Sequence, residues 1–437
     1  MEWWVYMLLF FGGLSALLLT GLPVAFAFVL VNVIGAYIFW GGEIGLTQLI
    51  LSIDSSVSTF VLVPVPMFIL MGTVMFHSGV AFKMIDVLDQ WLGRIAGRLA
   101  ILAVAAGALF ATLTGVAMGS VAMLGSTLAP DMERRGYAKS MSLGPILASG
   151  SLAIMIPPSA LAVILAGLGK FSIGKLLVGI IVPGLLLALV YLAYIVVRCS
   201  LQPSLAPAYH VSPTPLPPRI RDTVRFVMPP ISVVVVVIGT IFLGMATPTE
   251  AAAIGALLTF LLALAYGRLS WAVIKKAVGS ATSLSVMVLI ILTGSAAFGQ
   301  LLSFSGVTPA LTQLAVNLPV EPIVVLILMQ VVVVFLGMFI EQTSIVMVTI
   351  PIFMPIVAAM GWDPVWFGAI MMLNLELATI SPPFGLSLFV MKGIASPDTT
   401  MADLYQAALP FVGLNFLVMG LMIGFPPLVL WLPGLMQ

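Results

Sequence analysis

Long apolar stretches, each bounded by glycine, proline or charged residues, run through almost the whole chain. A helix needs about 20 mainly apolar residues to cross the hydrocarbon core of a bilayer. The pattern therefore predicts a bundle of helices that cross a membrane. Ten full spans are expected, at residues 5–20, 23–40, 57–79, 140–169, 176–197, 226–246, 251–267, 277–300, 364–392 and 404–431.

An apolar segment at 99–130 does not fit a single crossing. Arg98 precedes it, and Arg134 and Arg135 follow it. Basic residues near the end of a span favour the cytoplasmic side of the membrane. Because both ends carry arginine, the pattern predicts a re-entrant hairpin that enters from the cytoplasm and returns there. Its tip is expected at the polar residues 112–115.

A second such segment, 321–355, is flanked by Glu321 and Asp363 and predicts a matching hairpin from the outside. Ten spans and two hairpins place both termini outside. Fourteen of the sixteen basic residues then face the cytoplasm, all except Lys170 and Lys175. The predicted fold class is an all-α integral membrane protein with about ten full spans and two re-entrant helical hairpins.

Composition supports a membrane environment and argues against several function classes. The 437-residue chain is 62% hydrophobic and 7% charged, whereas soluble domains carry about 25% charged residues. Its net charge of +1 argues against nucleic-acid binding, which needs a concentrated basic face. No HExxH motif, P-loop or Ser/His/Asp set can be recognised. The sequence therefore predicts neither an enzyme nor a bound cofactor.

The two halves of the chain share a pattern of proline and glycine. Pro130, Gly136 and the Pro157-Pro158 pair each have a counterpart 225 residues later. With an odd number of crossings in each copy, the copies are predicted to be inverted. Inverted repeats with interrupted helices are typical of secondary transporters. The predicted organisation is a first repeat at 1–198, a cytoplasmic linker at 199–225 and a second repeat at 226–437.

Consecutive prolines interrupt two predicted spans, at Pro157-Pro158 and at Pro382-Pro383. Proline lacks a backbone N–H, so carbonyls of the preceding turn lose their helical donors, and a dry bilayer offers no replacement. A hard cation such as sodium takes carbonyl and hydroxyl oxygens, and helix N-termini attract anions. Each break is predicted to face a polar hairpin tip, at 112–115 or 337–344, which favours an ion site in each half.

Glu341 and Glu376 are the acidic residues predicted at membrane depth, where carboxylates mark functional sites. Glu341 is the stronger candidate because it lies at a hairpin tip. The alternative for Glu376 is a pairing with a neighbouring polar group or with a partner subunit. No basic residue is predicted deep in a span. Dipoles, amides and hydroxyls, or a basic residue near the end of a span, would then hold an anion. Candidate substrate-binding residues are Ser149, Ser151, Ser159, Glu341 and Asn374.

Across nearly its whole length, the chain resembles the large membrane subunit of TRAP transporters, the DctM type. The resemblance rests on paired motifs in the two halves. They are Gly115-Val116-Ala117 through Pro130, Arg135-Gly136-Tyr137 and Ile156-Pro157-Pro158-Ser159 in the first half, and Leu336-Gly337-Met338, Pro351 to Pro355, Gly361, Asn374 and Ser381-Pro382-Pro383-Phe384-Gly385 in the second.

This resemblance implies a sodium-driven elevator transporter in the cytoplasmic (inner) membrane of a bacterium or archaeon, with sodium as the coupling ion. It would import a small organic acid, such as a C4-dicarboxylate or a sialic acid. The expected partners are a periplasmic substrate-binding protein and a separate small four-helix membrane subunit. The implied sodium-binding residues are Thr114, Gly115, Ala153, Ile156 and Pro158 at one site, and Gly337, Thr343, Ala378, Ser381 and Pro383 at the other.

Two positions depart from the family pattern. The family often has glycine at the position of Ala153 and aspartate at that of Glu341, which affects the backbone geometry and the reach of the carboxylate. Other interpretations stay open. A stand-alone ion-coupled carboxylate carrier would need no binding protein. A membrane enzyme acting on lipid-linked substrates and a channel are less consistent with the repeat and the hairpins.

Overall fold

The computed structural model describes residues 2–93, 95–114, 117–208 and 215–436. All regular secondary structure in these ranges is helical. The first half consists of α1 (Trp3–Met7), η1 (Leu8–Gly12), α2 (Gly13–Leu19), α3 (Val24–Phe39), α4 (Glu43–Val57), η2 (Phe60–Leu62), α5 (Pro64–His77), α6 (Val80–Trp91), α7 (Arg98–Thr114), α8 (Ala117–Arg134), α9 (Lys139–Met155), α10 (Ala160–Gly169), α11 (Ile173–Gly179) and α12 (Ile181–Leu201).

The second half follows a short connection that contains η3 (Pro203–Leu205). It consists of α13 (Leu216–Asp222), η4 (Thr223–Val227), α14 (Met228–Phe242), α15 (Pro248–Ala265), α16 (Trp271–Phe304), α17 (Val307–Asn317), α18 (Pro322–Gly337), α19 (Gln342–Ala359), α20 (Pro364–Ile380), α21 (Leu386–Ile394), α22 (Met401–Gly424), α23 (Pro427–Leu430) and η5 (Pro433–Leu435).

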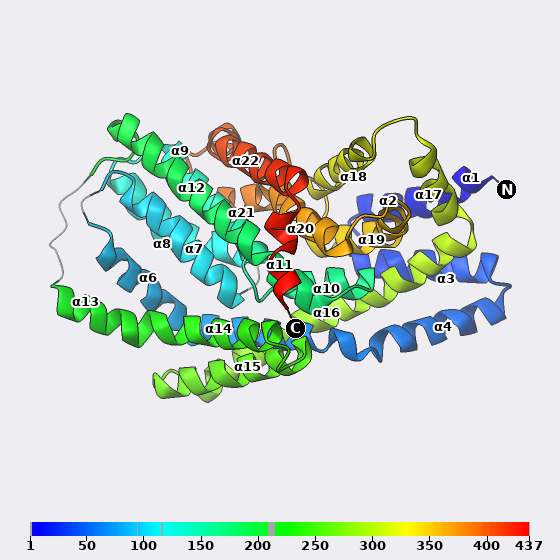
Figure 1. The fold of residues 1–437 in the computed structure, drawn as a ribbon, viewed down its shortest axis with the longest axis horizontal. Helices are drawn as coiled ribbons and strands as arrows, with labels where there is room; N and C mark the ends of the chain where they lie inside the picture. The colour runs from blue at the N-terminus through cyan, green and yellow to red at the C-terminus, as the bar shows by residue number, and fades with distance from the viewer. Residues whose placement is uncertain (1, 94, 115–116, 209–214, 437) are drawn as a thin grey trace.

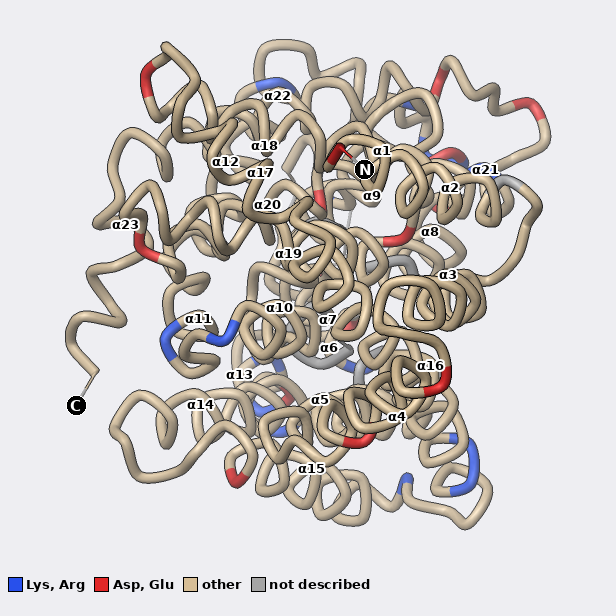
Figure 2. Tube along the Cα trace, turned by 90° about the vertical axis from the view of Figure 1, so that its right-hand side faces the viewer, with Lys and Arg blue, Asp and Glu red and all other residues tan. Residues whose placement is uncertain are grey.

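Within the described residues, seven helical segments are long and apolar enough to cross a membrane, or eight if the bent pair α9–α10 counts as one. Shorter apolar helices occupy other segments that the sequence assigned to spans, including Trp3–Leu18, Val24–Phe39 and Pro364–Ile380. The all-α membrane fold is therefore confirmed, while the number of crossings stays a prediction. Figure 2 shows how few charged positions interrupt the helices.

Local sequence signals fix several helix ends. Thr247 and Glu250 form a capping box at the start of α15: the Glu250 N–H donates to Thr247 Oγ1, and the Thr247 N–H donates to Glu250 Oε2 at 2.8 Å. Pro248 occupies the first turn, where its missing N–H costs no helical hydrogen bond. Thr400 and Asp403 form a second capping box at the start of α22. Such caps satisfy donors that a helix start would otherwise leave bare.

Glycines in the two halves of the chain have similar backbone conformations. Gly79 and Gly306 are left-handed, with φ of 71° and 80°, and they directly precede α6 and α17. Gly136 and Gly361, with φ of 78° and 70°, each follow a helix of an apolar hairpin. Residues with a Cβ rarely adopt this conformation, and so glycine is the residue these turns require.

Two interrupted helices form the centre of the fold. Every residue of α20 from Val365 to Ile380 is buried, and α9 packs against α20, α7, α8 and α22. Figure 1 shows α20 near the middle of the molecule. Polar groups placed on α9 or α20 are therefore shielded from lipid by surrounding helices.

A second group of helices packs around α16, which contacts α3, α4 and α5. Asn32 Nδ2 on α3 donates to the Gly294 carbonyl at 2.6 Å, and the Phe298 ring lies edge-on to the rings of Phe10 and Phe28. Figure 1 shows α14 and α15 side by side along one border of this group. Aromatic pairs of this geometry add to the stability gained by burial.

Two elements differ from the expectation. Helix α4 occupies residues between predicted spans; its Asp54 and several serines obscured it, because the segment is too polar to be read as a crossing. The helix expected to begin at 226 begins at Leu216, because Pro217 and Pro218 lie in the first turn of α13, where proline is tolerated. Helix α13 thus covers part of the 199–225 segment, and the role of that segment as a cytoplasmic linker stays a prediction.

Candidate functional site

The candidate site is built around two helix breaks, residues 156–159 between α9 and α10 and residues 381–385 between α20 and α21. Helices α9 and α10 differ in direction by 47°. Each break contains a Pro-Pro pair, joined by a cis peptide bond. Pro157 and Pro382 cannot donate to the carbonyls four residues earlier, at Ala153 and Ala378, which are both fully buried. The Ala378 carbonyl accepts the Ser381 N–H at 3.3 Å instead.

Two predicted substrate-binding serines, Ser149 and Ser159, lie on either side of the first Pro-Pro pair. Ser159 caps α10, accepting the Ala162 N–H at 3.3 Å. Ser149 is fully buried and donates to the Ile146 carbonyl, while the absence of a side chain at Gly107 lets α7 approach it closely. Ser149 therefore lies against α7, and Ser159 lies at the start of α10.

Part of the first predicted site lies outside the described residues. This applies to Gly115 and to the side chains of Thr114 and Ser151. Helices α7 and α8 end and begin on either side of this position, at Thr114 and Ala117. The two helices pack against each other and against α9, and so a hairpin of helices does occupy the predicted segment.

The second hairpin, α18 and α19, has a polar tip. Glu341 precedes α19, and its carboxylate accepts the hydroxyl of Thr343 at 2.7 Å and that of Ser344 at 3.4 Å. Thr343 and Ser344 are buried. Asp and Glu are favourable near a helix N-terminus, which accounts for part of this arrangement. The structure thus joins two predicted site residues, Glu341 and Thr343, in one cluster.

The tip of this hairpin contacts the helix before the second break. A Cβ on Gly337 would lie 2.1 Å from the Cβ of Ala378, so only glycine permits this approach. Nearby, Gln342 Nε2 donates to the Leu375 carbonyl at 3.3 Å. Glu376, the next residue along, is fully buried. The structure therefore brings Gly337 and Ala378 together, as a shared ion site requires.

Residues of the second break make specific hydrogen bonds. Ser381 Oγ donates to the Leu377 carbonyl at 2.8 Å and leaves its lone pairs for a ligand. The Pro383 carbonyl, a predicted sodium ligand, accepts the hydroxyl of Tyr405 on α22 at 2.7 Å. A carbonyl oxygen has a second lone pair, so this bond positions Pro383 without excluding a cation. Sequence reasoning missed Tyr405, because nothing in a lone tyrosine indicates its partner.

Asn374 is placed differently from the other candidates. Its Nδ2 donates to the main-chain and side-chain oxygens of Gln330 on α18, both at 2.8 Å. The two residues line a largely apolar groove of about 380 Å³ between α18, α20 and α22. Asn374 therefore joins α18 to α20, and a substrate role for it would require this pair to open.

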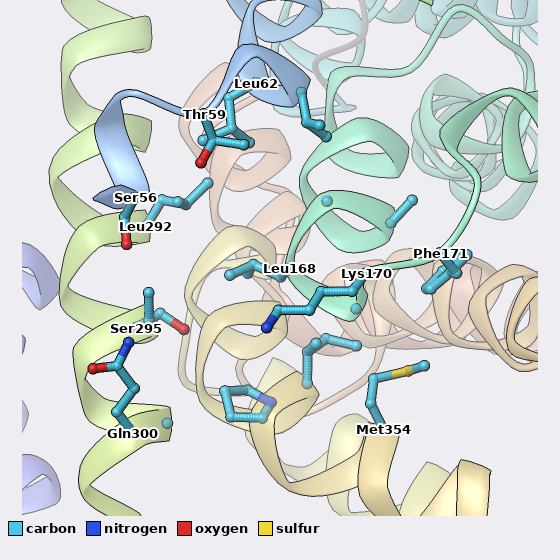
Figure 3. A pocket seen from close by; sticks show the side chains of 18 of the residues that line it. Ser56, Thr59, Leu62, Leu168, Lys170, Phe171, Leu292, Ser295, Gln300 and Met354 are labelled. Atoms are coloured by element: carbon cyan, nitrogen blue, oxygen red, sulfur yellow. The ribbon is translucent and has the colours of Figure 1, made fainter. Parts of the chain in front are cut away.

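A cleft of about 1230 Å³ lies between the two groups of helices, which also contact each other directly through α16 and α19. One wall is formed by the end of α10, with Lys170, and by the second half of α19. The opposite wall comes from α4, η2 and α16, including Ser56, Ser295 and Gln300. Figure 3 shows the side chain of Lys170 extending across this cleft toward α16. Sequence reasoning placed Lys170 outside but did not connect it with the polar residues of α4 and α16.

Comparisons with known proteins identify the family. The DctM component of the tripartite ATP-independent periplasmic transporters matches residues 11–428. The chain is 31% identical to the C4-dicarboxylate TRAP transporter large permease protein DctM of Pseudomonas aeruginosa, covering 86% of each chain. It is 30% identical to the isethionate TRAP transporter permease protein DctMQ of Oleidesulfovibrio alaskensis, covering 94% of this chain and 63% of that protein.

The fold is also similar to a solved structure, the YdaH transporter of Alcanivorax borkumensis. The TM-score is 0.65 at 17% identity, and the alignment covers 88% of this chain and 90% of that one. At this identity the likeness concerns the fold alone. The family match extends over nearly the whole chain, and the chain belongs to the DctM component family of tripartite ATP-independent periplasmic transporters.

Proposed function

We propose that this chain is the large membrane subunit of a sodium-coupled importer of a small organic acid, which receives its substrate from a periplasmic binding protein. The observation that carries the proposal is the pair of Pro-Pro helix breaks, the first buried and the second partly exposed at Pro383 and Phe384, each beside a pair of apolar helices. Uptake into vesicles under a sodium gradient, with the partner proteins supplied, tests it.

Sodium is the proposed coupling ion because the sites offer oxygen ligands. Around the second break these are the Ala378 and Pro383 carbonyls and the Ser381 and Thr343 hydroxyls. Hard cations prefer such ligands. In the described part of the chain, no three His, Cys, Asp or Glu side chains form a metal-binding group. The ligands proposed for the cation are therefore backbone and hydroxyl oxygens. Glu341 would add negative charge beside this cation.

The substrate is proposed to be an organic anion. The two named relatives are a C4-dicarboxylate and an isethionate transporter, and both names denote small acids. A carboxylate at Glu341 would repel such a substrate. Sodium bound first would offset that charge, so sodium and substrate would bind with positive coupling. Ser149, Ser151 and Ser159 remain the proposed substrate contacts.

Transport is proposed to follow an elevator mechanism built on inverted repeats. The hairpins and the broken helices would form the moving unit, and the helices around α16 and α5 the fixed scaffold. Alternating access in inverted-repeat transporters commonly uses such rigid-body movement. The cleft between α10, α19 and α16 supports the proposal, since it lies between these two groups.

Two protein partners and the inner membrane complete the proposal. The family description names a tripartite, periplasmic transporter, which supports a binding protein and a second membrane subunit. The DctMQ relative is longer than the aligned region, which covers 63% of it, and we propose that this chain works with a small membrane subunit. A periplasmic partner places the chain in the cytoplasmic membrane.

Replacing Thr343 with valine is expected to weaken sodium dependence. The change keeps the shape of the side chain and removes the hydroxyl that donates to Glu341. A hydrogen bond to a charged group is worth about 1.5–3 kcal/mol, so the half-saturating sodium concentration should rise about tenfold or more. Sodium titration of uptake measures it. Thr349→Val, which removes a hydroxyl bonded within α19, is the control. Equal sodium titrations for both variants would remove Thr343 from the site.

Replacing Tyr405 with phenylalanine is expected to have a smaller effect. The variant loses only the hydroxyl that positions the Pro383 carbonyl, and a neutral hydrogen bond contributes about 1 kcal/mol. The half-saturating sodium concentration should therefore rise about fivefold at most. Tyr37→Phe, at a side chain that is 55% exposed, provides the comparison. A Tyr405→Phe protein with wild-type sodium affinity would show that this bond does not shape the second break.

A further inference from the structure

Lys170 has an unusual backbone conformation at the end of α10. Its φ and ψ are 55° and 40°, and it is the only non-glycine residue with positive φ in the described chain. Glycine normally occupies this position after a helix. An unfavourable conformation that persists points to a role for the side chain, and a lysine here keeps its charge at a cost to the backbone.

The residues on either side hold this conformation in place. The Phe171 N–H donates to the Ala166 carbonyl at 3.1 Å. The Phe171 ring lies where a Cβ on Gly368 of α20 would be 2.9 Å away, and it also leaves no room for a side chain at Gly169. Lys170 is therefore anchored next to the buried central helix, and its side chain starts from a fixed point.

Among the described residues, the cleft around the Lys170 ammonium group contains no negatively charged side chain. None of the residues that line the cleft is Asp or Glu, and Lys170 is the only charged one. Within the described chain it forms no ion pair. Figure 3 shows the side chain reaching across the cleft toward Ser295 and Gln300, instead of folding back over the end of α10. An interaction with the dipole of α10 alone does not account for this direction.

The hydroxyls of the cleft complement an ammonium group. Ser56 and Thr59 donate to main-chain carbonyls of α4, and Ser295 donates to the Met347 carbonyl. The protons of these three hydroxyls are therefore already donated, and their oxygen lone pairs remain available to accept hydrogen bonds. The donors left for an anionic group among the side chains that line the cleft are the Lys170 ammonium, the Gln300 amide and the Ser303 hydroxyl. Figure 3 shows the Lys170 and Gln300 side chains in the same cleft, and their donors match the chemistry of a carboxylate or sulfonate, with the hydroxyl lone pairs accepting from any O–H or N–H group of the same ligand.

We propose that Lys170 and Gln300 form an outer anion site in this cleft, which takes the carboxylate or sulfonate group of the substrate before it reaches the helix breaks. The inference rests on the proposed function and adds a specific residue for selecting acids. A cleft of one charge sign with apolar walls concentrates ligands of the opposite sign. Lys170 therefore supplies the positive charge that the central helices lack.

The chain offers a clean chemical test, because its one cysteine, Cys199, is fully buried. In Lys170→Cys, the half-saturating concentration of the acid should rise about tenfold, in line with electrostatic steering, while the maximal rate stays near that of the wild type. 2-Aminoethyl methanethiosulfonate restores an ammonium group at this position and should restore the affinity. 2-Sulfonatoethyl methanethiosulfonate adds a negative charge and should lower it further. Lys175→Cys, an exposed position five residues later and outside the cleft, is the matched control and should respond to neither reagent.

Protection of Lys170→Cys identifies the ligand. Succinate or isethionate alone should slow its modification in vesicles that lack the binding protein, and uncharged glycerol should not. Protection by the binding protein alone would overturn the proposal in favour of a protein-docking contact. An unchanged half-saturating concentration in Lys170→Cys would also overturn it. Failure of the wild-type protein to transport any acid would instead refute the proposed function itself.

Lys170→Gly separates folding from binding. Glycine suits the left-handed conformation, so the thermal unfolding temperature should stay the same or rise while the affinity for the acid falls as in Lys170→Cys. A protein that loses both stability and affinity would show that the lysine serves the fold and would contradict the proposed anion site.

Discussion

A disulfide between Gly299→Cys on α16 and Pro351→Cys on α19 should reduce uptake to background. A Cβ on Gly299 would lie 2.9 Å from the Cβ of Pro351, so a small shift suffices to form the bond, which needs about 3.5–4.5 Å. In the proposed mechanism, α19 moves with the transport unit and α16 stays with the scaffold. A covalent bond between them would block the movement that gates turnover. Uptake before and after oxidation, and again after reduction, measures the effect.

A matched pair within one unit controls for the disulfide itself. Phe28→Cys on α3 and Gly294→Cys on α16 are equally close, since a Cβ on Gly294 would lie 2.7 Å from the Cβ of Phe28. Both helices belong to the proposed scaffold, so this disulfide should leave uptake at the level of its reduced form. If the oxidised double variant Gly299→Cys, Pro351→Cys transported as fast as its reduced form, that result would contradict movement between α16 and α19.

Gly337→Ala is expected to have the second large effect. Its new methyl group would lie 2.1 Å from the Cβ of Ala378 and must push the hairpin tip away from α20. Overpacking of this kind costs about 1–3 kcal/mol. Because the displaced groups are proposed sodium ligands, the half-saturating sodium concentration should rise about tenfold or more. Sodium titration of uptake, with sodium binding to the purified protein as a second measurement, shows the change.

A glycine without close neighbours provides the control for that substitution. Nothing lies within 4 Å of a Cβ added to Gly413 on α22, so Gly413→Ala should retain wild-type sodium affinity. The account would be contradicted at this point if Gly337→Ala folded, reached the membrane and kept wild-type sodium affinity. The second hairpin tip would then not take part in the sodium site.

The apolar pattern predicted much of the fold, because the lipid bilayer requires long apolar stretches in the helices that cross it. The stretch 277–300 lies within α16, and most of 404–431 lies within α22 and α23. Arginines around 99–130 correctly indicated a segment of two helices, since basic residues mark ends. The segment 41–57 escaped prediction, because helix α4 mixes serines and Asp54 with apolar residues and lies against α3 and α16.

The candidate site could be predicted only where chemistry acts locally. Proline removes its own donor whatever surrounds it, so the breaks at Pro157 and Pro382 followed from the sequence. Pairings across the chain did not. The Tyr405 hydroxyl reaches Pro383 from another helix, and Asn374 turns to Gln330 on α18. Lys170 shares the cleft with residues more than a hundred positions away, and only packing brings them together.

The most direct test of the central claim is radiolabelled uptake by proteoliposomes that contain this chain and a four-helix partner subunit, with an inward sodium gradient. The same vesicles are tested with the substrate-binding protein present, with it absent, and with sodium replaced by potassium. The account predicts uptake of an organic acid only when sodium and the binding protein are both present. Sodium-driven uptake without the binding protein would show a stand-alone carrier, and equal uptake in potassium would contradict sodium coupling.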